Sequence, residues 1–385
     1  MAVQWSARGG GGRSRSERLE RAARVAVRDC LGVGEGERVL IVTNPPEDVS
    51  TISDALYRQV EGAGGRPVLL VQPVKGQLDL ADPAVIAAIR SGPEVVLSIS
   101  AEKLGKDREA LKRPIIGTRG RDGGRRRRRY DHVFEYLLSE RRIRSFWSPG
   151  VTRDMFERTV PIDYPELQSR CAALASVLTA AAEVRVTTPE GTDLVIGLRG
   201  RRCRKDDGDF TRPGAGGNIP CGEVFISPEL GTARGQLVFD GSISSDRGAI
   251  VIGTPIACEV EGGFVKDVSG ASEARRIRAV IERSHERALR MGRSGDVPPA
   301  RAQLLARNAW GLGELGIGLN PAARIVGNML EDEKAFRTCH VAIGANYDDD
   351  APALTHLDGL MKGPTIVAVG RTGRTRVLLQ DGVLA

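Results

Sequence analysis

The most constraining feature of this sequence is a regular alternation, in its first half, between short apolar runs and amphipathic segments. The runs at 37–44, 66–73 and 94–100 are rich in Val, Ile and Leu. The segments between them, such as 53–65 and 82–90, place apolar residues at helical spacing. Strands that helices separate in this way are buried on both faces, which is typical of a parallel sheet. The sequence therefore predicts an α/β domain with a parallel sheet.

The pattern changes after Glu183. Short strand patterns separated by glycine-rich turns follow one another, and helical patterns interrupt them around 271–292 and 299–310. This texture predicts an α+β, β-rich second domain. The predicted division is a disordered tail at 1–17, an α/β domain at 18–182 and a β-rich metal-binding catalytic domain at 183–385.

Composition excludes a membrane-spanning protein and favours a cytoplasmic one. No stretch approaches the roughly 18 consecutive apolar residues of a membrane span. The first residues lack the apolar core of a secretory signal, and the six cysteines are scattered rather than paired in CxxC motifs. We therefore expect reduced thiols, a cytoplasmic location and no membrane partner.

The net charge of +7 comes mainly from one segment. Residues 119–129 contain seven arginines and one aspartate, a sum of +6. Such a run can bind phosphates, but no aromatic residue alternates with the arginines for base stacking. We interpret the segment as a solvated insertion between a helix and a strand, so a nucleic-acid partner is not expected.

Two of the four histidines lie close together in the stretch 331–360. His356 and Asp358 are two residues apart, and in a strand that spacing points both side chains to one face. His340 opens another apolar run, HVAIG. Two imidazoles and a carboxylate suit Zn, Co, Mn or non-haem Fe(II). These residues predict a metal site.

Two glutamates elsewhere strengthen this prediction. Glu223 lies in NIPCGEVFIS, where a turn leads into a strand, and Glu314 lies in the glycine-framed GLGELGIGLNP. A charged residue at a strand end is common. Both glutamates, however, lie beside apolar runs, where an unpaired carboxylate would be costly to desolvate.

The order of short motifs from 218 to 362 resembles that of the M29 metalloaminopeptidases, also called the aminopeptidase T family. The motifs are GEVF, FDGS, GELGIGLNP, LEDEK, CHVAIG with a tyrosine seven residues after its histidine, and THLDGL. None of them is specific alone, but six in the family's order are. The α/β half fits the family's first domain more loosely.

The resemblance implies a peptide-cleaving homodimer with two divalent ions in each chain, zinc or cobalt and in some cases manganese. It implies a catalytic role for Tyr347. An acidic residue before the histidine strand also belongs to the pattern in some family members, and Glu333 is the candidate here, at a longer distance from His340 than the family shows. The implied metal ligands are Glu223, Glu314, His340, His356 and Asp358.

The implied reaction removes N-terminal residues from peptides. A water shared by two metal ions loses its proton near neutral pH and can attack a polarised carbonyl. Glu223 or Glu314 would serve as the proton shuttle, and the Tyr347 hydroxyl would donate to the oxyanion.

A second enzyme class has a similar architecture. Ring-cleaving dioxygenases that act on dihydroxypyridines use one Fe(II), held by two histidines and an aspartate. His340, His356 and Asp358 would serve that chemistry without any glutamate. The presence of Glu223 and Glu314 favours the hydrolase.

The remaining candidates are expected to have no functional role. His132 and His285 lie in charged helical segments and should be solvated. The three consecutive aspartates at 348–350 lack the alternate spacing of an EF-hand and should form a solvated turn.

Overall fold

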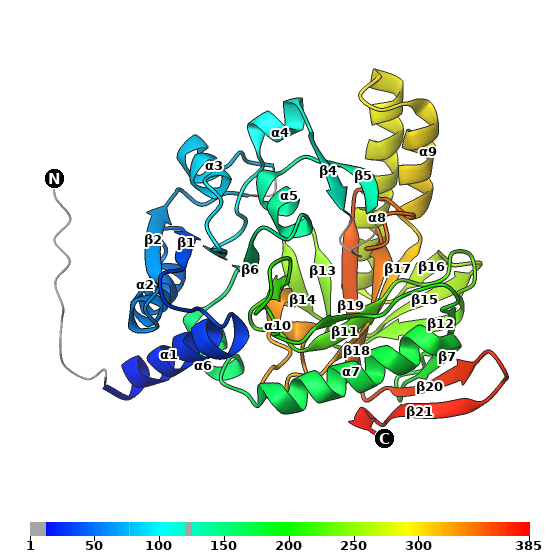
Figure 1. Cartoon of the computed structure of the whole chain (residues 1–385). Helices are drawn as coiled ribbons and strands as arrows, with labels where there is room; N and C mark the ends of the chain where they lie inside the picture. The colour runs from blue at the N-terminus through cyan, green and yellow to red at the C-terminus, as the bar shows by residue number, and fades with distance from the viewer. Residues whose placement is uncertain (1–12, 77, 120–124) are drawn as a thin grey trace. The chain divides into compact units, whose positions relative to one another are not determined.

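The structure is a computed structural model that describes residues 13–76, 78–119 and 125–385 (Figure 1). The chain forms two compact units. Unit 1 comprises Met1–Pro161 and Gly208–Pro220, and unit 2 comprises Ile162–Asp207 and Cys221–Ala385. Among the described residues, no helix has the length and apolar character needed to cross a membrane.

Unit 1 contains the predicted parallel sheet, with strand order β10-β6-β3-β1-β2. Alternate residues of β1 and β3 point to opposite faces, and both faces are buried. On one face Leu40, Val42 and Val96 form a core with apolar residues of α3 and α5. The helices α1, α2 and α6 pack against one another, and α2 also contacts β1, β2 and β3 of the sheet. The predicted α/β architecture is confirmed.

The elements of unit 1 have these bounds: α1 (Arg13–Val25), the π-helix η1 (Ala26–Cys30), β1 (Arg38–Thr43), α2 (Glu47–Gly62), β2 (Arg66–Val71), α3 (Pro83–Arg90), β3 (Val95–Ser100), α4 (Arg108–Lys112), β4 (Ile115–Arg119), β5 (Arg125–Tyr130), α5 (Val133–Ser139), β6 (Arg144–Pro149), α6 (Arg153–Thr159) and β10 (Gly216–Asn218).

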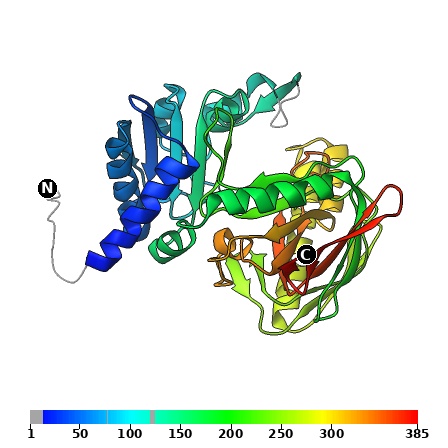
Figure 2. The ribbon, with the colours of Figure 1, turned by 60° about the horizontal axis from the view of Figure 1, so that its bottom comes forward.

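Unit 2 is built on two sheets of seven and eight strands, and most of their pairings are antiparallel (Figures 1 and 2). The seven-stranded sheet has the order β14-β13-β19-β18-β17-β11-β9. The long helix α7 contacts β9 and β11 of this sheet and also β7 and β20 of the other. The predicted β-rich character is confirmed.

The elements of unit 2 have these bounds: α7 (Tyr164–Ala180), β7 (Ala181–Thr187), β8 (Asp193–Gly197), β9 (Arg204–Asp206), β11 (Glu223–Ile226), β12 (Arg234–Phe239), β13 (Ser242–Ser245), β14 (Gly248–Val251), β15 (Ile256–Glu261), β16 (Phe264–Ser269), α8 (Ser272–Ser294), α9 (Pro299–Asn308), β17 (Leu312–Gly318), α10 (Met329–Asp332), β18 (Thr338–Gly344), β19 (His356–Lys362), β20 (Thr365–Gly370), β21 (Thr375–Gln380) and β22 (Val383–Leu384).

The compact units differ from the predicted division at residue 182. The helix α7, which the sequence groups with the α/β part, belongs to unit 2, and the segment 208–220 returns to unit 1. There β10 adds a three-residue edge strand beside β6. A strand this short, composed of Gly-Gly-Asn, carries no apolar pattern that would indicate its sheet.

Two smaller expectations also change. Residues 1–12 of the predicted tail lie outside the described residues, but 13–17 already belong to α1, because Arg, Ser and Glu extend a helix at little cost. The arginine-rich segment, interpreted from the sequence as a solvated insertion between a helix and a strand, contributes to β4 and β5, which pair as an antiparallel ladder. Residues 120–124 between these strands lie outside the described part.

Candidate metal centre

Four neighbouring strands of the seven-stranded sheet bring the five predicted ligands together (Figure 1). His356 and Asp358 lie on β19, His340 on β18, Glu314 on β17, and Glu223 at the start of β11. Their ligand atoms form two groups, within each of which all atoms lie within 4.8 Å of one another. The first group is Glu223, Glu314 and His340, and the second is Glu314, His356 and Asp358.

Glu314 is shared by the two groups, and its carboxylate lies between the imidazoles. The Nε2 atom of His340 is 3.1 Å from Glu314 Oε1 and 3.6 Å from Glu223 Oε2. The Nε2 atom of His356 is 3.0 Å from Asp358 Oδ1 and 3.7 Å from Glu314 Oε2. Carboxylate and imidazole donors therefore alternate across the sheet.

Glycines in these strands make room for bulky side chains nearby. Gly316 pairs with His340 across β17 and β18, and a Cβ atom on Gly316 would lie 2.0 Å from His340 Nε2. Gly359, between Asp358 and Leu360 on β19, faces Phe239, and a Cβ there would lie 2.5 Å from that ring. Gly316 thus makes room for a predicted ligand, whereas Gly359 makes room for Phe239.

The site is buried and its groups perturb one another. Burial by itself would lower the pKa of His340, but the hydrogen bond to Glu314 and the charge of Glu223 raise this pKa to about 9. Burial opposes protonation of His356 too, yet Asp358 raises its pKa to about 10. Burial tends to raise the pKa of Asp358, but the His356 charge dominates and lowers it to about 2. When no metal ion is bound, both imidazoles are thus protonated at neutral pH.

The donor set fits a divalent cation. Among the described residues, Glu223 Oε2, Glu314 Oε2 and His340 Nδ1 are buried polar atoms that make no hydrogen bond. Desolvation raises the pKa of both Glu223 and Glu314, which shows that their charge is costly in this setting. A bound cation would compensate buried carboxylates of this kind.

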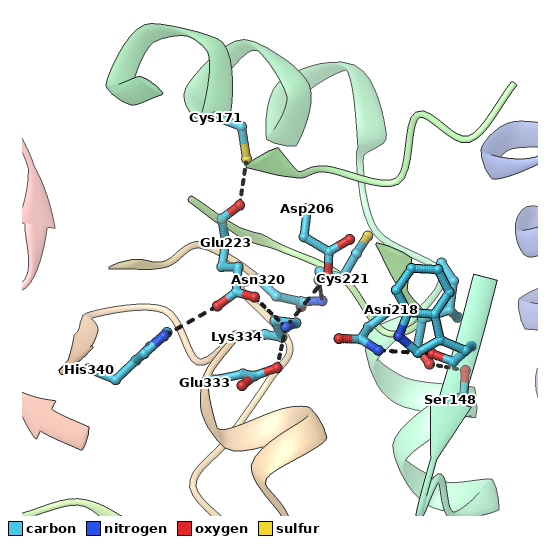
Figure 3. Close-up of polar contacts among 12 residues, drawn as sticks. Ser148, Cys171, Asp206, Asn218, Cys221, Glu223, Asn320, Glu333, Lys334 and His340 are labelled. Atoms are coloured by element: carbon cyan, nitrogen blue, oxygen red, sulfur yellow. Dashed lines mark hydrogen bonds and ion pairs between the residues drawn. The ribbon is translucent and has the colours of Figure 1, made fainter. Parts of the chain in front are cut away.

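Lys334 is a member of the site that the sequence reasoning missed. Its side chain is fully buried, and Nζ is 2.6 Å from Glu223 Oε1 and 3.5 Å from Asp206 Oδ2. It also forms an ion pair with Glu333. Figure 3 shows Lys334 between Glu223 and Glu333, with His340 on the other side of the Glu223 carboxylate. The LEDEK motif places this lysine among acids, but that pattern by itself is also typical of a solvated lysine.

Glu333 therefore contacts Lys334 rather than the ligand groups. Among the described residues, neither group of potential metal ligands includes it. Glu333 follows α10, whose last residue, Asp332, accepts hydrogen bonds from Ser242 Oγ at 2.6 Å and from the Val326 amide at 2.8 Å. The FDGS and LEDEK motifs are joined by this Ser242 bond, which fixes the turn that carries Lys334.

Tyr347 lies at the edge of the cluster. Its ring centroid is 5.1 Å from that of His356 and 5.3 Å from that of Phe225, and 43% of the residue is exposed. Desolvation of the hydroxyl, followed by the charges of Glu314 and Asp358, raises the Tyr347 pKa well above its usual value. The phenol is therefore a hydrogen-bond donor at neutral pH.

The aspartates after Tyr347 do more than form the expected solvated turn. Asp348 pairs with Arg204 at 3.0 Å, and Asp350 pairs with Arg201 at 2.7 Å. Arg204 also donates to the Tyr347 carbonyl at 2.9 Å. These contacts anchor the loop that carries Tyr347 to the strand β9 and the turn before it.

The two other histidines lie outside the cluster. His132 is the N-cap of α5, where its Nδ1 accepts a hydrogen bond from the Phe134 amide. His285 on α8 contacts the Ala306 carbonyl through Nδ1 at 2.9 Å. Both are partly buried and hydrogen-bonded rather than solvated, and both have local structural roles.

A buried array of imidazoles and carboxylates across one sheet is the donor chemistry of a metal-dependent enzyme. Comparison with known proteins supports that class. The profile of a family described as NicX, 2,5-dihydroxypyridine 5,6-dioxygenase, matches residues 151–341, which include Glu223, Glu314 and His340. No curated protein matches the chain.

Two solved structures share the fold over nearly the whole chain. The 2,5-dihydroxypyridine dioxygenase of Pseudomonas putida KT2440 is 15% identical, with a TM-score of 0.67 and 98% of each chain covered. AmpT from Thermus thermophilus, an M29 aminopeptidase, is 18% identical, with a TM-score of 0.62, 96% of this chain and 99% of AmpT covered. At these identities the likeness establishes the fold, and both activities expected from the sequence occur on it.

Proposed function

We propose that this protein is a ring-cleaving dioxygenase that acts on a dihydroxylated nitrogen heteroaromatic ring at a single divalent metal ion. The observation that carries the proposal is the register of β18 and β19. It places His340 beside Leu360 and Ala342 beside Asp358, so that His340, His356 and Asp358 project from the same face of adjacent strands. The dioxygenase family profile supports the same assignment.

This donor set suits the proposed chemistry. Two imidazoles and one carboxylate would leave a bound Fe(II) with open positions for the hydroxylated ring and dioxygen. Both oxygen atoms enter the ring-opened product as one ring bond breaks, so the reaction needs no further reductant. The Tyr347 phenol, beside His356, would hydrogen-bond a ring substituent and orient it.

A metalloaminopeptidase is the second candidate, and one observation favours it. Glu314 belongs to both groups of potential ligands, as a carboxylate bridging two ions would. In that case Glu223 or Glu314 moves the proton and Tyr347 donates to the oxyanion of a peptide substrate. We rank the dioxygenase first, whereas the sequence favoured the aminopeptidase. The reason is that Lys334 already pairs with Glu223, which the first group of potential ligands needs as a carboxylate. The homodimer implied by the resemblance stays a prediction.

The two candidates predict different activities. Protein reconstituted with Fe(II) without oxygen should consume one O₂ per 2,5-dihydroxypyridine when air is admitted, with loss of the ring's ultraviolet absorbance. His356→Ala should abolish this consumption, because it removes one ligand. His285→Ala, a histidine change on α8 away from the cluster, is the matched control and should retain it.

The contrary result is equally clear. If Zn²⁺- or Co²⁺-loaded protein released p-nitroaniline from aminoacyl p-nitroanilides while the Fe(II) form left the heteroaromatic ring intact, the aminopeptidase would replace the dioxygenase.

A further inference from the structure

The cluster contains a cation of its own. Lys334 is fully buried, and its ammonium group contacts carboxylate oxygens from three segments: Glu223 on β11, Asp206 on β9 and Glu333 after α10 (Figure 3). Glu223 and Asp206 face each other across the β9–β11 ladder. A buried ammonium is stable only when opposite charges surround it in this way.

The position of the Lys334 ammonium affects whether the first group of potential ligands can bind a divalent ion. One oxygen of Glu223 contacts Lys334 at 2.6 Å, and the other lies 3.6 Å from His340 Nε2. The first ligand group needs Glu223 as one of its carboxylates, whereas the second group, Glu314, His356 and Asp358, does not. A divalent ion in the first group would share the Glu223 carboxylate with a positive charge already bound to it.

We propose that the Lys334 ammonium takes the place of a second metal ion, so that each chain binds one divalent cation. The single ion would be held by His340, His356 and Asp358, with the Glu314 carboxylate beside both imidazoles. Lys334 is a positioning residue that keeps Glu223 away from the metal. The inference depends on the proposed function only in requiring that the cluster binds metal, and it is incompatible with a two-metal aminopeptidase.

The charge balance explains why the ammonium and a second ion exclude one another. Lys334, Glu223, Glu333 and Asp206 together carry one positive and three negative charges. Removing the ammonium would leave three acids close together at a buried position, and such a group attracts a divalent ion. Lys334→Gln should therefore create the second metal site that the natural chain lacks.

Metal content tests this directly. Metal-free protein is equilibrated with excess Zn²⁺ or Co²⁺ and desalted, and bound metal per chain is measured by elemental analysis and by titration calorimetry. We expect about one equivalent for the natural chain and about two for Lys334→Gln. Lys334→Arg keeps the charge and should remain at about one.

A second variant keeps the proposal testable if Lys334→Gln does not fold. Glu223→Gln in the natural background should leave the stoichiometry at one and the affinity within about threefold, because Glu223 is not a ligand. At a two-metal site the same change would reduce the count from two to one.

The overturning results are specific. Two equivalents bound by the natural chain, or one equivalent bound by folded Lys334→Gln, would each refute the role of Lys334. The metal stoichiometry is measured independently of enzyme activity. If the protein bound one equivalent of metal but failed the dioxygenase assay, the proposed function would be refuted and this inference would still hold.

Discussion

At the scale of single residues, protons and a metal ion compete for the imidazoles of His340 and His356. An imidazole binds a cation only when neutral, whereas the nearby carboxylates raise the pKa of His340 to about 9 and that of His356 to about 10. Both values lie above the usual pKa of histidine, so at pH 7 the metal-free site holds both protons. Metal binding must release them, and the affinity should rise with pH until these pKa values are passed.

The expected result is the release of about two protons per ion bound, and a rise in log affinity of about two per pH unit between pH 7 and 9. Titration calorimetry in buffers of different ionisation enthalpy measures this number. His356→Ala should lower it to about one, and His285→Ala should leave it unchanged. An affinity that did not vary with pH would show that the imidazoles are not ligands.

At the scale of elements, the close pairing of β17 with β18 sets the position of His340. Gly316→Ala would introduce a Cβ atom 2.0 Å from His340 Nε2, so the imidazole must move. Changes that misplace a ligand without removing it cost roughly 10–100-fold in metal affinity. We expect a loss of that size, measured by competition with a chromophoric chelator. Gly62→Ala, where the added methyl meets no atom within 4 Å, should bind metal normally.

The same two strands show how far the sequence can predict this site. The apolar HVAIG run and the HLD spacing indicate strands β18 and β19, and with them the facing of His340, His356 and Asp358. The sequence pattern does not indicate β17, because the glycines of GELGIG have low strand propensity. Tertiary packing explains why a glycine is needed there, since Gly316 makes room for His340 on the next strand.

Lys334 and Asp206 show why the remainder of the site is invisible in the sequence. They lie 128 positions apart in the sequence, and only the placement of β9 next to β11 brings Asp206 to the Lys334 ammonium. A buried lysine is rare, so a lysine in an acidic motif is normally interpreted as solvated. Its burial depends on carboxylates from segments that no local pattern connects.

At the scale of the whole molecule, the two units divide the tasks. Unit 1 has its own core between the parallel sheet and the helices α3 and α5, and it contains none of the proposed ligands. All five ligands predicted from the sequence, and Lys334, belong to unit 2. Composition shows the change from α/β to β-rich texture, but it cannot show that the chain passes back into unit 1 at 208–220.

This division predicts how metal affects unfolding. A ligand that binds only the folded form stabilises it by about 2.7 kcal/mol at a free concentration 100 times its Kd. For a unit of this size that corresponds to roughly 5–10 °C. We expect two thermal transitions in differential scanning calorimetry, of which only the unit 2 transition moves upward with metal and returns with a chelator. His340→Ala should remove the shift. If instead both transitions moved together by the same amount, the units would unfold as one cooperative body, and the metal site would stabilise the whole chain.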